Sequence, residues 1–310
     1  MFMRISKYIV ILLIQLTFFN NIGKSVENKI LFKINNEIIT TVDLLNEIKY
    51  LKTLNTDFKE FDQNKIYEIS KNSLIREKIK EIELLKFYKS IKIKDEYIDR
   101  TINKLVTNAN FKNINDFLEY LNKENIKLDT IKKKITIEVM WNDLIVSKFL
   151  KNIKIDKQKI KEEIIKNNKQ TEFLLSEIVF SIKDNEKIDK KFNTISQTIK
   201  EKKFNNAALI YSVSETANIG GKLGWVKESS INQKIKKELL KISIGQHTQP
   251  IVVPGGFLIL KIDNIRKIDV DKNIDNEVAL IVKQKISSQL NQQSNKYYKK
   301  IKKDFLIHEL

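Results

Sequence analysis

The stretch Ile219–Trp225, read as IGGKLGW, holds three of the seven glycines in a chain of 310 residues. A glycine pair before a strand indicates positive φ angles or a close approach of the backbone to another segment. A phosphate-binding loop does not fit, because there is no G-x-x-x-x-G-K-[ST] pattern and no strand leading into a helix start. The glycines are therefore expected to be structural, and their surroundings must identify the module.

The sequence around this stretch alternates between strand-like and helix-like segments. Residues 171–182, TEFLLSEIVFSI, are apolar with β-branched side chains, which is typical of a strand. Hydrophobic spacing and turn residues predict the remaining elements: helices over 187–202, 204–211 and 231–242, a strand over 223–226, and two strands within 249–262 joined at Pro254-Gly255-Gly256. The order β-α-α-β-α-β-β predicts one small sheet covered by helices.

Residues 211–261 resemble the parvulin family of peptidyl-prolyl isomerases, also called rotamases. The resemblance runs through YSVSETANIGGKLGWV, INQKIKKELLKISIGQHTQPIVV and GGFLILKI, and it needs no gap from Gly220 to Ile262. LLSEIVF matches the family's first strand. The resemblance implies a parvulin fold with a peptide-binding site and isomerisation of X-Pro bonds, whose rotation barrier is about 18–20 kcal/mol.

In parvulins, an apolar pocket holds the proline ring, and two His with a Cys or Asp surround the carbonyl that rotates. The resemblance places aliphatic residues at the pocket positions, with an aromatic residue beside them as a further substrate contact: Leu223, Ile231, Ile235 and Phe257. The three polar positions hold other residue types: Glu177, Ser214 and Leu258. The pocket is thus kept in aliphatic form, whereas the polar ring is degenerate, and isomerase activity is predicted to be weak or absent.

Glu177 belongs to a predicted alternating strand, where a lone carboxylate facing the helix-covered side is costly. It either pairs with a lysine or reaches solvent, or it binds a peptide amide or a basic residue of a client. The chain's only two histidines, His247 and His308, fall at neither family position and are expected at the surface.

The rest of the chain is similar to SurA-type periplasmic chaperones. A hairpin is predicted at 30–40, a helix capped by Thr41 follows, and further helices reach about residue 165, with Asn115-Asp116 capping one of them. Residues 276–310 predict a single amphipathic helix. The fold class is therefore α+β, mostly α. The expected domains are a signal peptide, a helical chaperone domain, the parvulin domain and a C-terminal helix that packs on the helical domain: 1–25, 26–168, 169–268 and 269–310.

The N-terminus has the layout of a secretory signal peptide. Arg4 and Lys7 precede a short apolar run, and Gly23 and Ser25 supply a cleavage site. The alternatives are a buried N-terminal helix and an uncleaved anchor. Cleavage predicts export to the periplasm of a Gram-negative envelope.

Lysine dominates the basic charge. The chain has 57 Lys and Arg against 39 Asp and Glu, a net charge of +18, but only four Arg. Because lysines are spread along the whole chain, nucleic-acid binding is not expected, whereas weak association with an anionic membrane surface is. The absence of Cys excludes disulfides, thiolate zinc sites and a Cys nucleophile. No cofactor or metal is expected.

The sequence predicts a periplasmic, ATP-independent chaperone that binds unfolded exported proteins, chiefly outer-membrane proteins during their assembly. A working prolyl isomerase is the main alternative. An assembly scaffold and a charge-driven membrane or nucleic-acid binder are further alternatives, and the latter needs a localised basic or aromatic platform that the sequence does not display.

Overall fold

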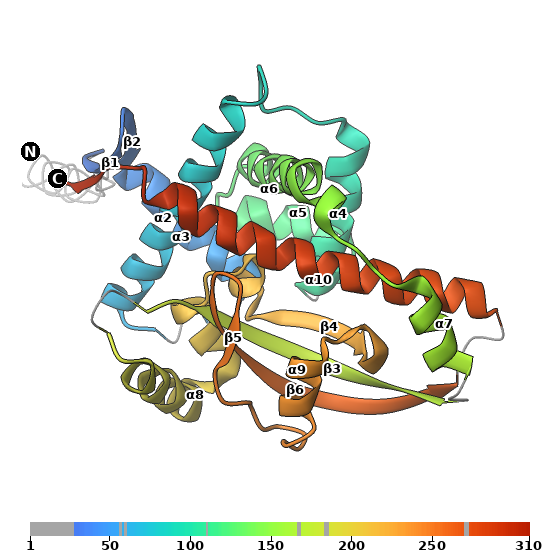
Figure 1. Cartoon of the computed structure of the whole chain (residues 1–310). Coiled ribbons are helices and arrows are strands. Elements are labelled where there is room, and N and C mark those ends of the chain that lie inside the picture. Colours follow the sequence, from blue (N-terminus) through green and yellow to red (C-terminus); the bar gives the residue numbers. More distant parts are fainter. Residues whose placement is uncertain are drawn as a thin grey trace, which may run out of the picture.

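The computed structural model describes residues 28–55, 58, 61–109, 111–165, 169–182, 186–269 and 273–310. The predicted signal peptide lies outside the described residues. A mostly helical part and a part built on a four-stranded sheet lie on either side of one long helix, α10 (Figure 1). The predicted fold class, α+β and mostly α, is confirmed. Among the described residues, no helix has the length and apolar character needed to cross a membrane.

The described residues begin with an antiparallel hairpin that turns at Asn35, whose φ is 51°. The helix that follows is capped by Thr40, not by Thr41 as predicted. The Thr40 side chain accepts from the backbone N–H of Asp43, and the Asp43 side chain accepts from the backbone N–H of Thr40, which satisfies two N–H groups at once. These elements are β1 (Ile30–Ile34), β2 (Glu37–Thr40) and α2 (Thr41–Leu54).

The helical part continues through four helices and a short 3-10 turn before a last short helix leads to the second sheet. One predicted cap is shifted, because Asn113 rather than Asn115 accepts from the backbone N–H of Asp116. The core of this part surrounds the fully buried Trp141. The elements are α3 (Gln63–Leu85), α4 (Asp95–Asn108), α5 (Ile114–Lys123), α6 (Leu128–Phe149), η2 (Leu150–Asn152) and α7 (Lys157–Ile165).

The C-terminal segment is a helix followed by a strand. The helix α10 (Ile274–Lys302) lies against α6, where the Trp141 indole N–H donates to Ser294 Oγ at 2.8 Å. The prediction that one helix runs to Leu310 is wrong. Residues after Lys303 leave the helix, and β7 (Ile307–Glu309) pairs antiparallel with β1, giving the strand order β2-β1-β7. Pairing with an open strand edge supplies the hydrogen bonds that a frayed helix end lacks.

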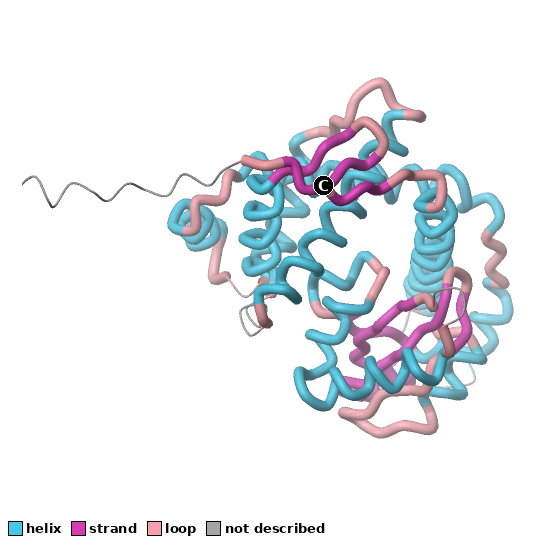
Figure 2. Tube along the Cα trace, turned by 90° about the vertical axis from the view of Figure 1, so that its left-hand side faces the viewer, coloured by secondary structure: helices cyan, strands magenta, loops and turns pink. Residues whose placement is uncertain are grey.

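The second sheet is entirely antiparallel, with the strand order β4-β3-β6-β5. Figure 2 shows its strands as a group separate from the first sheet, with helices between the two. Side chains of β3 and β6 alternate between two apolar clusters, one containing residues of α8 and one containing residues of α9. The elements are β3 (Lys169–Phe180), α8 (Ile188–Tyr211), η3 (Glu215–Ile219), β4 (Lys222–Lys227), η4 (Glu228–Ser230), α9 (Gln233–Leu239), β5 (Ile251–Val253) and β6 (Gly256–Asp269).

The glycine pair of the opening stretch brings the start of β4 against β3. Gly220 and Gly221 have φ angles of 72° and 78°, in the left-handed region. A Cβ on Gly221 would lie 2.1 Å from the backbone oxygen of Glu177, and the Glu177 N–H donates to the Gly221 carbonyl at 2.8 Å. The pair therefore fixes the backbone of Glu177, one of the predicted site residues.

Candidate peptide-binding site

The apolar pocket positions come together on the α9 side of the sheet. Leu223 of β4, Ile231 before α9, Ile235 of α9 and Leu258 of β6 belong to one apolar cluster. Ile231 and Leu258 are buried, whereas Leu223 and Ile235 are partly exposed. The last two side chains therefore form the accessible part of this surface.

Phe257 lies on the opposite side of the sheet from these four residues. It packs in the cluster that contains α8, where its ring stacks on Phe180 with centroids 5.5 Å apart. Because Leu258 is its direct neighbour in β6, strand alternation puts the two side chains on different faces. The structure therefore does not bring Phe257 together with the other predicted substrate contacts.

Glu177 ends a chain of hydroxyl groups. Thr216 Oγ1 donates to Glu177 Oε1 at 2.9 Å, and Ser214 Oγ lies 2.7 Å from Thr216 Oγ1. Ser212 Oγ is 2.9 Å from Ser214 Oγ and accepts from the backbone N–H of Val179 at 3.0 Å. Glu177 and Ser214, which the sequence assigns to the polar ring, are thus linked through Thr216.

The surroundings of Glu177 favour its neutral form. Burial raises the pKa of this carboxyl above its ordinary value, the hydroxyls of Thr216 and Ser214 oppose that shift, and the nearby Glu215 charge adds to it. Sequence reasoning missed Thr216 and Ser212. Spacing alone does not reveal them, because Thr216 lies in the 3-10 turn η3, and Ser212 and Ser214 precede it in a loop folded against β3.

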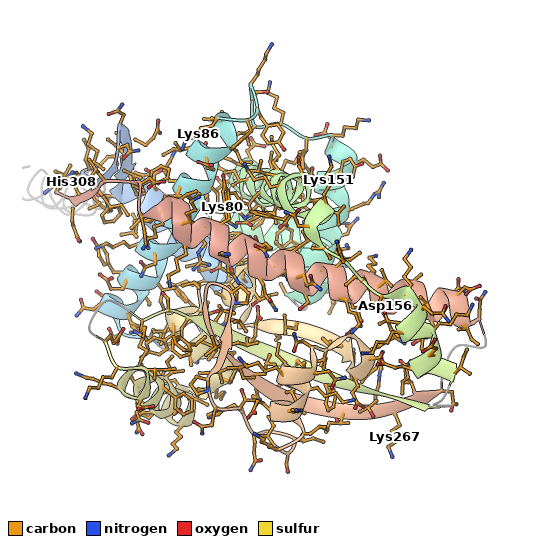
Figure 3. All side chains as sticks on the ribbon, in the orientation of Figure 1. Lys80, Lys86, Lys151, Asp156, Lys267 and His308 are labelled. Atoms are coloured by element: carbon orange, nitrogen blue, oxygen red, sulfur yellow. The ribbon has the colours of Figure 1, made fainter. Side chains whose placement is uncertain are left out.

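Neither histidine hydrogen-bonds to Glu177 in the described part of the chain. The His247 ring lies edge-on to Phe192 of α8, with centroids 6.1 Å apart. His308 is exposed in β7, beside the N-terminal hairpin (Figure 3). The polar positions of the family therefore hold a carboxyl, a hydroxyl and a buried aliphatic side chain. Among the described residues, no group of three or more His, Asp or Glu is arranged to hold a metal ion.

The helical part holds the backbone of the hydroxyl chain directly. The Arg76 guanidinium of α3 donates to the carbonyl of Ser214 at 2.9 Å and to that of Ser212 at 3.2 Å. Lys80, one turn further along α3 and buried, pairs with Glu138 at 2.6 Å and with Glu215 at 3.4 Å. The position of the candidate site is therefore coupled to the helical part by charged hydrogen bonds.

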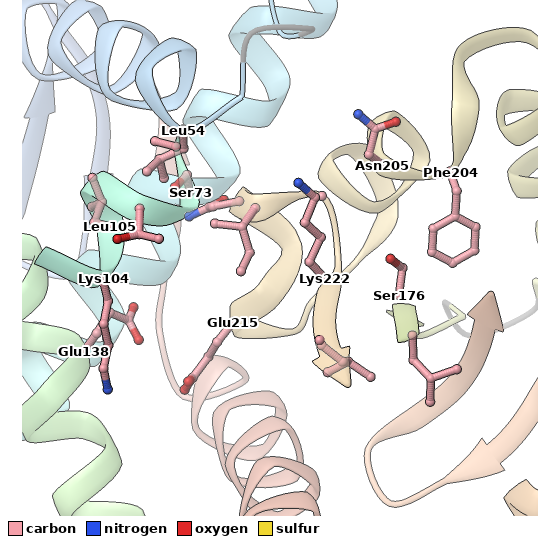
Figure 4. Close-up of a pocket in the computed structure, with 18 of the residues that line it drawn as sticks. Leu54, Ser73, Lys104, Leu105, Glu138, Ser176, Phe204, Asn205, Glu215 and Lys222 are labelled. Atoms are coloured by element: carbon pink, nitrogen blue, oxygen red, sulfur yellow. The ribbon is translucent and has the colours of Figure 1, made fainter. Parts of the chain in front are cut away.

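A cavity of about 1120 Å³ lies between the helical part and the second sheet. Leu54, Lys104 and Glu138 line it from the helical part, and Ser176 and Lys222 line it from the strands (Figure 4). Of the predicted pocket residues, Leu223 also lines this cavity. The cavity and the apolar surface of Ile235 thus meet at Leu223.

A protein-family comparison matches the second sheet and its helices. The rotamase family model, described as a PPIC-type PPIase domain, matches residues 155–264. The curated Chaperone SurA of Pseudomonas putida is 25% identical over 187 residues, which is 57% of this chain and 44% of the relative. The chain therefore covers less than half of the length of that relative.

Solved structures are related at lower identity. A SurA-like chaperone of Campylobacter jejuni is 19% identical, covers 91% of this chain and 99% of its own, and has a TM-score of 0.34. The peptidyl-prolyl isomerase PrsA of Bacillus anthracis is 18% identical, covers 76% of this chain and 100% of its own, and has the same TM-score of 0.34. From the sequence matches, the chain is similar to SurA chaperones over more than half of its length and carries one parvulin-type, PPIC-type domain.

Proposed function

We propose that this protein is a periplasmic, ATP-independent chaperone that binds unfolded exported polypeptides, and that its PPIC-type domain holds peptides better than it isomerises them. One observation carries the second statement. Leu258 is buried among aliphatic side chains at a position where parvulins place an imidazole, so this position offers no polar group to a rotating carbonyl.

Isomerisation is accelerated only by groups that interact more strongly with the twisted amide than with the planar one. A well-placed donor contributes roughly 10²–10³-fold. Loss of two imidazoles therefore leaves activity near the uncatalysed rate, whereas binding through Leu223 and Ile235 depends on apolar area and persists.

The proposed clients are outer-membrane proteins in an unfolded state, and the proposed route to them is export through the N-terminal signal peptide. The similarity to SurA chaperones supports a chaperone role. The lysine-rich composition supports a weak attraction to anionic membrane surfaces as well.

The test is a protease-coupled isomerase assay run beside an aggregation-suppression assay on the same purified mature protein. We expect suppression of aggregation with isomerase activity near background. Activity equal to that of an ordinary parvulin would support the alternative function, a working prolyl isomerase.

A substitution in α9 separates binding at the pocket from binding elsewhere. Ile235→Asp places a charge on the partly exposed apolar surface and is expected to weaken binding of an apolar peptide about tenfold or more. Gln233→Asp introduces the same charge at an exposed position of the same helix and serves as the control. Equal affinities for the two variants would move the peptide site away from this surface.

A further inference from the structure

The carboxylate of Glu177 is held by hydroxyl groups and not by a cation. Its Oε1 accepts from Thr216, and the one charged neighbour that influences it is another carboxylate, that of Glu215. Among the described residues, no Lys or Arg lies within ion-pair distance of it. Glu172, on the same strand, is paired with the Arg266 guanidinium at 2.6 Å. Glu177 thus differs from Glu172 of the same strand in having no cationic partner among the described residues.

Three lysines of α9 and β6 have partners other than Glu177. Lys236 of α9 pairs with Glu228 at 2.6 Å, and Lys261 of β6 pairs with Asp263 at 2.6 Å. The Lys234 ammonium donates to the carbonyl of Val252 at 3.4 Å. These three ammonium groups do not compensate the Glu177 carboxylate, so it can accept a cationic group that comes from outside.

Glu177 also lies beside the apolar surface. By strand alternation it shares a face with Leu175 and Val179, whose side chains belong to the same cluster as Leu223 and Ile235. It is itself partly exposed, so a side chain from outside can reach it. A peptide that rests an apolar residue on Leu223 and Ile235 therefore brings a neighbouring side chain to this carboxylate.

We propose that Glu177 makes this site selective for peptides that carry Lys or Arg next to proline or another compact apolar residue. The inference rests on the proposed function, that this face of the domain binds peptides. The net charge of +18 repels cationic peptides at long range. Salt screens that repulsion beyond about 8 Å at physiological ionic strength, whereas a contact ion pair in a partly buried site is screened much less.

The experiment measures binding of fluorescein-labelled peptides to the full mature chain by anisotropy at physiological salt. The peptides share one apolar sequence around an Xaa-Pro pair, with Xaa as Lys, norleucine or Glu. Norleucine keeps the length of the lysine stem and removes its charge. We expect the Lys peptide to bind about tenfold more tightly than the norleucine peptide, as for a hydrogen bond to a charged group, and the Glu peptide to bind most weakly.

Glu177→Gln is expected to bring the ratio of Lys to norleucine affinity close to one. Glu238→Gln removes the same charge from α9, where Glu238 pairs with Lys241, and is expected to leave the ratio as in the unmodified protein. If Glu177→Gln keeps the full ratio, the selectivity inference is overturned while peptide binding stands. If no peptide binds at all, the proposed binding function falls together with the inference.

Discussion

Two carboxylate sites in this molecule are compensated in different ways. In the helical part, Glu47 lies 2.5 Å from the Lys134 ammonium, which also pairs with Glu77 and lies 4.9 Å from the centroid of the Tyr50 ring. Burial lowers the pKa of Lys134, but the carboxylates of Glu47 and Glu77 outweigh burial and raise that pKa above its ordinary value. At Glu177, hydroxyl groups take the place of the cation.

The different partners of Glu47 and Glu177 indicate different roles for the two carboxylates. A buried charge that carries its own counter-ion is part of the scaffold, because removing one partner leaves the other uncompensated. A carboxylate held only by neutral donors keeps its attraction for a cation. The helical site is thus closed, whereas the Glu177 site is open in the sense that no Lys or Arg of the described residues pairs with it.

Removing the cation of the closed helical site is expected to give the largest effect on stability. Lys134→Met leaves Glu47 buried without a cation and is expected to lower the free energy of unfolding by about 3–5 kcal/mol. Urea denaturation of the mature protein measures it. Lys133→Met removes the neighbouring cation, which is half exposed and pairs with Glu81 at 2.8 Å, and is expected to cost less than about 1 kcal/mol. Equal losses for both variants would show that the closed site does not stabilise the helical part.

Placing imidazoles at the two family positions of the Glu177 site is expected to increase isomerase activity. Glu177→His with Leu258→His is expected to raise kcat/KM for a prolyl peptide about 100-fold. Either substitution alone is expected to do little, because the groups act as a unit. Leu258→His alone also controls for the cost of an imidazole among Val179 and Ile251. An unchanged rate in a folded double variant would show that the framework around these positions is not that of an active parvulin.

The contact between the helical part and the second sheet is expected to have the next largest effect. Arg76→Ala removes the guanidinium that donates to the carbonyls of Ser212 and Ser214, and is expected to cost about 1.5–3 kcal/mol. Thermal unfolding monitored by calorimetry measures it. Arg100→Ala removes an exposed pair with Glu96 and is the control, with a loss below about 1 kcal/mol. If Arg76→Ala shifts the transition no more than its control, the helical part does not hold the site in place.

Local patterns were sufficient for several features of the second sheet. The β-α-α-β-α-β-β order follows from hydrophobic spacing and from the glycine and proline turns. The predicted break between the helices 187–202 and 204–211 coincides with Lys203, whose φ of 69° interrupts α8. Strand alternation alone also separates Phe257 from Leu258, so the assignment of Phe257 to the pocket ignored a rule that the sequence already contained.

Long-range contacts escaped the sequence analysis. Arg76 and Ser214 are 138 residues apart, and no local pattern pairs a guanidinium with a backbone carbonyl at that separation. β7 was missed because Ile301 and Phe305 continue a helical spacing, while the strand depends on the open edge of β1. The hydroxyl chain to Glu177 depends on how a loop is folded against a strand, which spacing alone does not specify.

The smallest expected effect concerns the charge of Glu177 in the absence of a peptide. Burial raises the pKa of this carboxyl above the ordinary 4.5, so its ionised form destabilises the folded state relative to the neutral form. Glu177→Gln keeps an acceptor for Thr216 and removes the charge, and is therefore expected to raise the free energy of unfolding at pH 8. The stability contributed by the neutral carboxyl is present in full below pH 4.5 and is lost as pH rises through the folded pKa.

The gain from glutamine must therefore shrink as pH falls and vanish below 4.5, where the unmodified protein is neutral at this position too. Urea denaturation of both proteins across this range measures the difference. A gain that is independent of pH would mean that the carboxyl titrates normally and that the site is as well compensated as the helical one.

A saturating Lys-Pro peptide adds a second measurement, because a cation bound to the carboxylate stabilises the ionised form. With that peptide present, the unmodified protein is expected to become the more stable of the two at pH 8, which no purely structural role of Glu177 produces.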